Sequence, residues 1–126
     1  MSLRLLLTIS GILEVLVGVL VLISPAPVVS LLLGAPTDAL ATVLARLFGA
    51  GVFALGLACL KARHDVASPA GLAVSLGITS YNLVAAVVII WAAAGLSLGG
   101  LLLWAAGIGH AVLGLLLVSA LVTSRR

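Results

Sequence analysis

Four residues able to do chemistry lie within otherwise apolar stretches of this sequence: Glu14, Arg46, Asn82 and His110. An ionisable side chain at the centre of a bilayer costs about 2.5–3.5 kcal/mol on insertion scales, so each one requires an explanation. Glu14 and Arg46 are suited to a buried ion pair, because a guanidinium fork matches a carboxylate with two parallel hydrogen bonds. Asn82, its neighbour Tyr81 and His110 would then satisfy the remaining donors and acceptors.

These polar residues fall at similar depths in their stretches, and each shares a helical face with small residues. Glu14, Tyr81, Asn82 and His110 lie near the middle of theirs, while Arg46 lies roughly 9 Å inside the outer end. Small residues line helix contacts in membranes because they let backbones approach closely. We therefore expect these faces to point inward and to form a polar cluster at the core of a compact four-helix bundle. The faces are Gly11, Glu14 and Gly18; Thr42, Arg46, Gly49, Phe53 and Gly56; Gly71, Ser75, Thr79, Asn82 and Ala86; and Gly100, Leu103, Gly107, His110 and Gly114.

Two interpretations of this cluster remain open. In the first, the Glu14–Arg46 pair is structural and fixes helix order and register without a ligand, as buried polar groups do in some proteins. In the second, the cluster lines a cavity that binds a small, largely apolar molecule with a polar head, and Trp104 lies near the outer mouth of that cavity.

Composition places these stretches in a membrane. Of 126 residues, 64% are hydrophobic and 7% are charged, whereas an average soluble domain is about 45–50% apolar and about 25% charged. The mean hydropathy is +1.48. So few charges exclude both a soluble domain and a disordered chain. The six Lys and Arg residues and 4% aromatic residues do not suggest nucleic acid as a partner.

The apolar stretches predict a single all-α domain over residues 1–126, a polytopic membrane protein with four spanning helices. The prolines after Ser24 end the first helix, Thr37 or Asp38 begins the second, and Ser68 begins the third. We expect a short interfacial or re-entrant segment in residues 24–39, which either covers a cavity or rests on lipid as a connector. The expected spans are about 5–23, 40–60, 70–93 and 98–122.

Charge distribution predicts the orientation of these spans. Five basic residues lie in the flanks that an even number of spans places on one side, and the opposite loops contain none. Cytoplasmic flanks carry the excess of Lys and Arg, so both termini are expected in the cytoplasm of a bacterium, with the chain in its inner membrane. The five residues are Arg4, Lys61, Arg63, Arg125 and Arg126.

Little in the sequence points to catalysis. His110 is the one histidine within a span and Cys59 is the one cysteine, so no metal-ligand set is expected. The sequence also shows no nucleophile–base pair and no phosphate-binding loop. We therefore expect no catalytic residues, no metal and no cofactor. An enzyme ranks third, behind a small-molecule binding or transport protein and an accessory subunit.

The segment ARLFGAGVFALGL at residues 45–57 resembles helix two of the DoxX-like four-helix membrane proteins of bacteria. The acidic residue in the first helix and the polar residue in the fourth also fit that pattern. The resemblance implies an accessory or small-molecule-handling role, near membrane oxidoreductases in some members, and it assigns no catalytic residue. Glu14 in Gly-Ile-Leu-Glu-Val is also similar to the first-helix glutamate of the small multidrug exporters, but Arg46 argues against that family because a fixed cation beside the glutamate would compete with its substrates.

The leading hypothesis is a protein that binds or transports a small lipophilic molecule at the cluster of Glu14, Arg46, Tyr81, Asn82 and His110, with Trp104 at the mouth. The alternative is an accessory or scaffold subunit of a membrane complex, in which the Glu14–Arg46 pair is structural. The expected partners are the lipid bilayer, a lipophilic small molecule, and further copies of this chain or another membrane subunit held through glycine seams.

Overall fold

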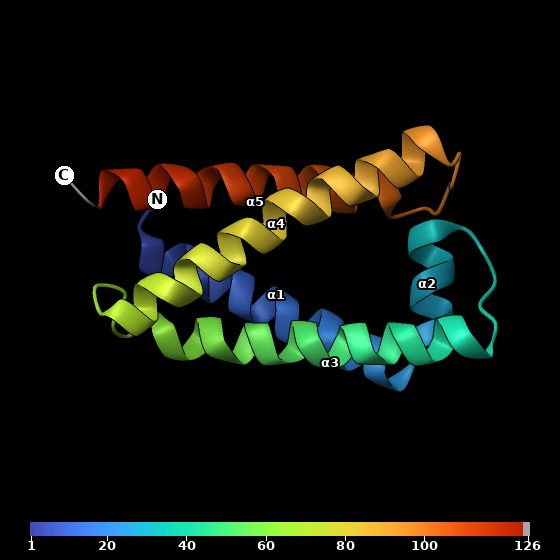
Figure 1. Ribbon diagram of the computed structural model, residues 1–126, viewed down its shortest axis with the longest axis horizontal. Coiled ribbons are helices and arrows are strands. Elements are labelled where there is room, and N and C mark those ends of the chain that lie inside the picture. The colour runs from blue at the N-terminus through green and yellow to red at the C-terminus, as the bar shows by residue number, and fades with distance from the viewer. Residues whose placement is uncertain (125–126) are drawn as a thin grey trace.

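The computed structural model describes residues 1–124, and every regular element within that range is a helix. Four of the helices are long and apolar enough to cross a membrane, with mean hydropathy between 2.0 and 2.6. The prediction of an all-α chain with four long apolar helices is therefore confirmed for the described residues. In chain order (Figure 1) the helices are α1 (Leu3–Ile23), α2 (Pro25–Leu33), α3 (Ala39–Ala62), α4 (Pro69–Gly95) and α5 (Leu103–Thr123).

Side-chain caps begin two of the long helices where the sequence predicted them. The Asp38 carboxylate accepts a hydrogen bond from the Ala41 N–H at 2.7 Å, and α3 begins at the next residue. The Ser68 hydroxyl accepts from the Gly71 N–H at 3.0 Å at the start of α4. Each cap satisfies an amide that has no partner within its helix.

The predicted start of the fourth span, at residue 98, is wrong. Leu98 to Leu102 form a loop with two consecutive glycines, and α5 begins at Leu103. The Leu102 N–H donates to the Leu31 carbonyl of α2 at 3.0 Å. This part of the loop therefore docks on α2 instead of extending α5 by another turn.

Glycines bring α1 and α3 into close antiparallel contact. Gly11 lies opposite Gly56 and Gly18 lies opposite Gly49. A Cβ added to Gly18 would lie 2.8 Å from the Gly49 carbonyl oxygen and 2.7 Å from the Phe53 backbone nitrogen. Because backbone atoms occupy this space, any side chain here would force the two helices apart.

The helices form two pairs, α1 with α3 and α4 with α5, which meet at one end and diverge toward the other (Figure 1). We call this arrangement the wedge, with a narrow end and a wide end. The expected compact bundle is therefore wrong, because the two pairs diverge and an apolar core lies at the narrow end. That core consists of Leu3, Leu6, Leu7, Cys59, Ile78, Leu117, Ala120 and Leu121. Polar residues are nevertheless buried inside the molecule, namely Ser10, Glu14, Ser75, Thr79 and Asn82.

The short helix α2 runs across the wide end of the wedge, roughly at right angles to the spans (Figure 1). It contacts α1 and α3 of one pair and α5 of the other. Gly34 ends α2 with a φ of +70°, a left-handed conformation that glycine adopts without strain. Its position against Gly99 and Gly100 leaves no room for a side chain. Thus α2 connects the two pairs where they are farthest apart.

Candidate functional site

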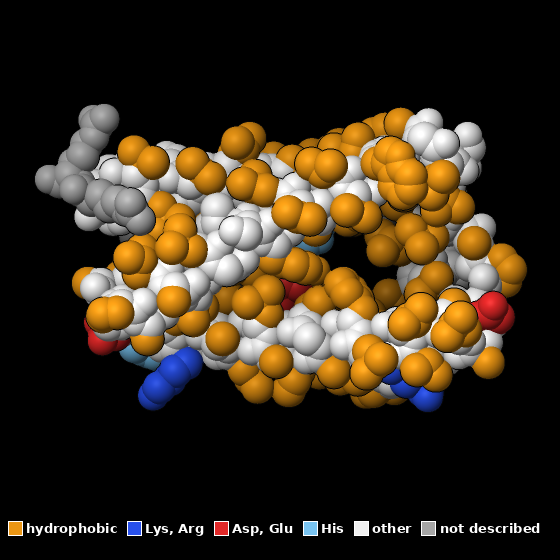
Figure 2. All heavy atoms as spheres, viewed as in Figure 1, with side chains coloured by type: hydrophobic (Ala, Val, Ile, Leu, Met, Phe, Trp, Pro, Cys, Tyr) orange, Lys and Arg blue, Asp and Glu red, His pale blue; other side chains and the backbone are white. Residues whose placement is uncertain are grey.

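A cavity of about 1180 Å³ lies between the two helix pairs. Figure 2 shows this hollow, with red acidic and pale blue histidine atoms at its wall. The wall comes from α1, α2, α4 and α5, with Phe48 from α3. Ligand pockets are commonly about 300–1,000 Å³, so this one has room for a drug-sized apolar molecule. Its polar lining residues are Glu14, Ser80, Tyr81, Asn82 and His110.

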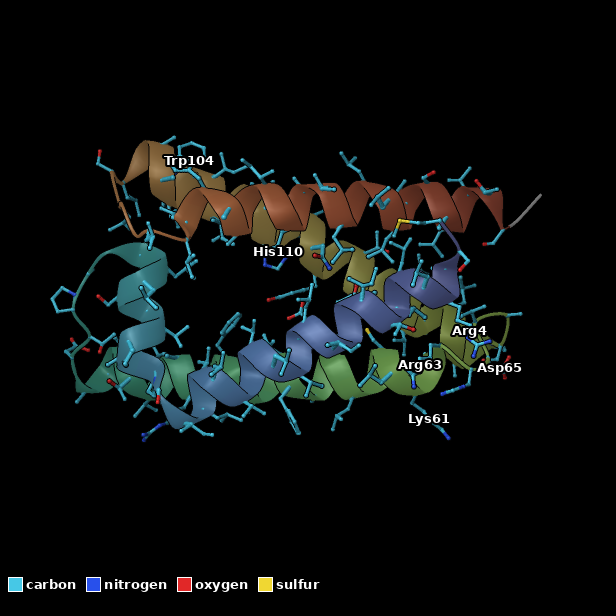
Figure 3. All side chains as sticks on the ribbon, turned by 180° about the vertical axis from the view of Figure 1, so that it is seen from behind. Arg4, Lys61, Arg63, Asp65, Trp104 and His110 are labelled. Atoms are coloured by element: carbon cyan, nitrogen blue, oxygen red, sulfur yellow. The ribbon has the colours of Figure 1, made fainter. Side chains whose placement is uncertain are left out.

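Asn82 and His110 form a polar pair across α4 and α5. The Asn82 amide nitrogen donates to the Ile78 carbonyl at 2.9 Å, which leaves its Oδ1 facing His110 Nδ1, also at 2.9 Å. An amide oxygen only accepts, so His110 must carry a proton on Nδ1. In the neutral ring Nε2 is then a free acceptor. Figure 3 shows the His110 ring directed from α5 into the hollow.

Tyr81 and Glu14 present oxygen atoms to the same cavity. The Tyr81 ring meets His110 edge-on, with ring centroids 5.6 Å apart and an interplanar angle of 86°. Glu14 is 5% exposed, and neither side chain has a hydrogen-bond partner within residues 1–124. The fully buried side-chain oxygen that lacks a partner is Ser10 Oγ, one turn before Glu14. The Glu14 and Tyr81 oxygens are therefore not sealed in protein but remain open to the cavity.

The predicted Glu14–Arg46 ion pair does not form in the described structure. Arg46 is exposed and does not line the cavity. The glycine register explains why: Gly18, one turn beyond Glu14, lies against Gly49, and Arg46 lies nearly one further turn beyond Gly49 on α3. The offset of two helical turns is about 10 Å along the axis. Arg46 thus lies outside the cavity, exposed near the wide end.

Trp104 also lies outside the cavity wall. It is 55% exposed on the first turn of α5, and Figure 3 shows it at the wide end on the side away from the hollow. Of the six residues predicted around a site, the structure therefore brings together Glu14, Tyr81, Asn82 and His110 and separates Arg46 and Trp104 from them.

The small-residue faces explain this outcome. The predicted faces on the first and third spans are buried throughout: Gly11, Glu14 and Gly18 on α1, and Gly71, Ser75, Thr79, Asn82 and Ala86 on α4. On α3, Gly49 and Gly56 are buried, but Arg46 is not, because the close contact with α1 ends near Val21.

Sequence reasoning did not assign the apolar wall of the cavity. Val28, Leu31 and Leu32 of α2 line its wide end, and Phe48 contributes from α3. These side chains have the same composition as those that face lipid, so hydropathy alone carries no signal for them. Gly109 is another lining residue, and a Cβ added there meets no atom within 4 Å.

The chemistry of this site is suited to recognition. Among residues 1–124, no three His, Cys, Asp or Glu side chains lie close enough to hold a metal ion. The cavity offers apolar surface, a carboxyl group, an imidazole acceptor and a phenol, which together can orient an amphiphilic molecule.

No family model, no curated protein and no solved structure matches this chain.

Proposed function

We propose that this protein binds a small lipophilic molecule in the cavity between its two helix pairs and handles it within a membrane. The observation that carries the proposal is the combination of an apolar cavity of about 1180 Å³ with polar groups from three helices in its lining. Binding sites commonly combine apolar walls with a few oriented polar groups in this way. A small-molecule-handling role also agrees with the resemblance of residues 45–57 to DoxX-like proteins, and we propose that relationship on this segment.

The structural interpretation of the polar cluster has less support. It requires Glu14 to be neutralised by Arg46, yet Arg46 is exposed and two turns away. A carboxyl group open to an apolar cavity and lacking a protein partner contributes little to packing, because burying an unpaired charge is costly. Its position is better explained by an occupant of the cavity.

Cavity-filling variants test the binding proposal. Gly109 lines the cavity and has open space for a Cβ, so Gly109→Leu is expected to fill part of the cavity. We expect native mass spectrometry of gently extracted wild-type protein to show a discrete bound mass that Gly109→Leu has lost. Gly77→Leu is the matched control, because Gly77 also has open space around its Cβ but does not line the cavity. A bound mass that survives in both variants, or is absent from wild type, would contradict the proposal.

We further propose that the narrow end faces the cytoplasm of a bacterium, with the protein in the inner membrane. Figure 3 shows Arg4, Lys61 and Arg63 gathered at the end of the molecule opposite α2. An excess of basic residues marks the cytoplasmic side of membrane proteins.

Single cysteines test this orientation in a Cys59→Ala background. Ala67 lies in the loop at the narrow end and Thr37 lies in the loop after α2. We expect an impermeant maleimide to label Thr37→Cys in intact cells and Ala67→Cys only after permeabilisation. The reverse pattern would show that the orientation is wrong.

A further inference from the structure

We infer that the molecule bound in the cavity carries a primary ammonium head on an apolar body. This inference rests on the proposed binding function and names its ligand class. It starts from Glu14, a carboxyl group that lines the cavity, and none of the described residues in the lining is Lys or Arg. A carboxylate in apolar surroundings is stabilised by a nearby positive charge, and here the ligand must supply it because Arg46 does not.

The neighbouring groups favour a head that donates several hydrogen bonds. His110 Nε2 is an acceptor, because the Nδ1–H is committed to Asn82. Tyr81 lines the same wall and its oxygen has no partner in the described chain. A primary ammonium carries three N–H donors, and the cavity lining offers one acceptor each from α1, α4 and α5. Aromatic faces at Tyr81 and His110 are compatible with a cation as well.

Other head groups fit this wall less well. A carboxylic acid would bring a second acidic group toward Glu14, and a phospholipid would bring a phosphate to a wall without cationic side chains. A trimethylammonium head has the charge but no N–H, so it leaves the imidazole and phenol acceptors unpaired. An alcohol has one donor and no charge. Bonds between ionised partners are roughly twice as strong as neutral ones.

The apolar body has a defined place in the cavity. Leu13, Val17 and Leu20 of α1 line it from the level of Glu14 toward the wide end, where Leu31 of α2 also contributes. These side chains form a continuous apolar wall about 10 Å long from Glu14 to Leu20. An unbranched alkyl chain would lie along this wall with its head at Glu14.

The test compares four probes of equal chain length: dodecylamine, dodecyltrimethylammonium, dodecanol and dodecanoic acid. Each is titrated into the protein in lipid nanodiscs, and bound probe is measured by native mass spectrometry. Binding that Gly109→Leu removes and Gly77→Leu retains is counted as cavity binding, which corrects for partition into lipid. We expect dodecylamine to bind wild type about 10- to 100-fold more tightly than the other three.

Variants of the polar lining residues test whether the preference for dodecylamine depends on Glu14 and Tyr81. Glu14→Gln removes the charge and is expected to bring the affinity for dodecylamine down to that for dodecanol. Tyr81→Phe removes one acceptor and is expected to cause a smaller loss, by about 5-fold. Circular dichroism checks that both variants fold. If Glu14→Gln does not fold, the probe comparison on wild type and Tyr81→Phe still decides.

The outcomes separate this inference from the binding proposal. Equal cavity binding of amine and alcohol, or of amine and trimethylammonium, would overturn the ammonium assignment and leave a lipophile site. Tighter binding of the acid would do the same. If no probe shows binding that depends on Gly109, the binding proposal itself fails.

Discussion

Gly56→Leu is expected to lower the midpoint of thermal unfolding by about 10 °C or more relative to wild type. A Cβ at Gly56 would lie 2.7 Å from the Val15 backbone nitrogen and 2.9 Å from the Gly11 carbonyl oxygen of α1. These are backbone atoms of a long helix, which cannot move aside as a flexible side chain can. The leucine therefore forces α1 and α3 apart along their whole contact.

The control for this prediction lies on the same helix. Gly51 has no atom within 4 Å of an added Cβ, so Gly51→Leu is expected to change the midpoint by only a few degrees. It also gains helix propensity, since glycine is about 1 kcal/mol less favourable than the best helix formers. Both midpoints are measured by circular dichroism in the same detergent. Equal losses in the two variants would show that the α1–α3 contact is not as the structure has it.

Gly100→Leu is expected to detach α2 from the α4–α5 loop. An added Cβ would overlap the backbone of Leu31 and Leu32, where the Leu102 N–H donates to the Leu31 carbonyl. We expect amide hydrogen exchange in residues 28–33 and at Leu102 to rise by about 10-fold or more, because each factor of ten requires only about 1.4 kcal/mol of lost docking energy. Hydrogen–deuterium exchange with mass spectrometry measures this directly.

Gly99→Leu is the matched control for this second prediction. Gly99 immediately precedes Gly100, yet its Cβ position is open, so exchange in α2 should stay within about 2-fold of wild type. The narrow-end core around Leu7 and Leu117 should be unaffected in both variants. A rise confined to that core, or an equal rise in Gly99→Leu, would be inconsistent with α2 docking on this loop.

Much of the fold could be predicted because membrane helices follow simple rules. Apolar length predicts the four long helices, and local capping chemistry predicted helix starts at Thr37 or Asp38 and at Ser68. The structure has Asp38 and Ser68 as the caps. Small-residue periodicity correctly assigned the buried face of α4 and the Glu14 face of α1. The start of α5 was missed because leucines in a docked loop have the same hydropathy as leucines in a helix.

The ion pair was wrongly predicted for a different reason. Depth along a helix was judged from the ends of apolar stretches, but the level at which two helices meet is set by close contacts. Here Gly11 against Gly56 and Gly18 against Gly49 fix the register, and they place Arg46 two turns from Glu14. The divergence of the two helix pairs depends on a crossing angle and on the docking of α2, neither of which leaves a periodic signal in the sequence.

The two ends of the wedge are held by different contacts. The apolar core joins the α1–α3 and α4–α5 pairs at the narrow end, and α2 contacts both pairs at the wide end. A small rotation of one helix pair about the narrow-end core is amplified over helices more than twenty residues long. The separation of the two pairs at the wide end therefore depends most on the length and docking of α2. Substitutions in α2 that touch no polar group should therefore alter the width of the cavity at the wide end, while substitutions in the core should alter how firmly the two pairs are held together at the narrow end.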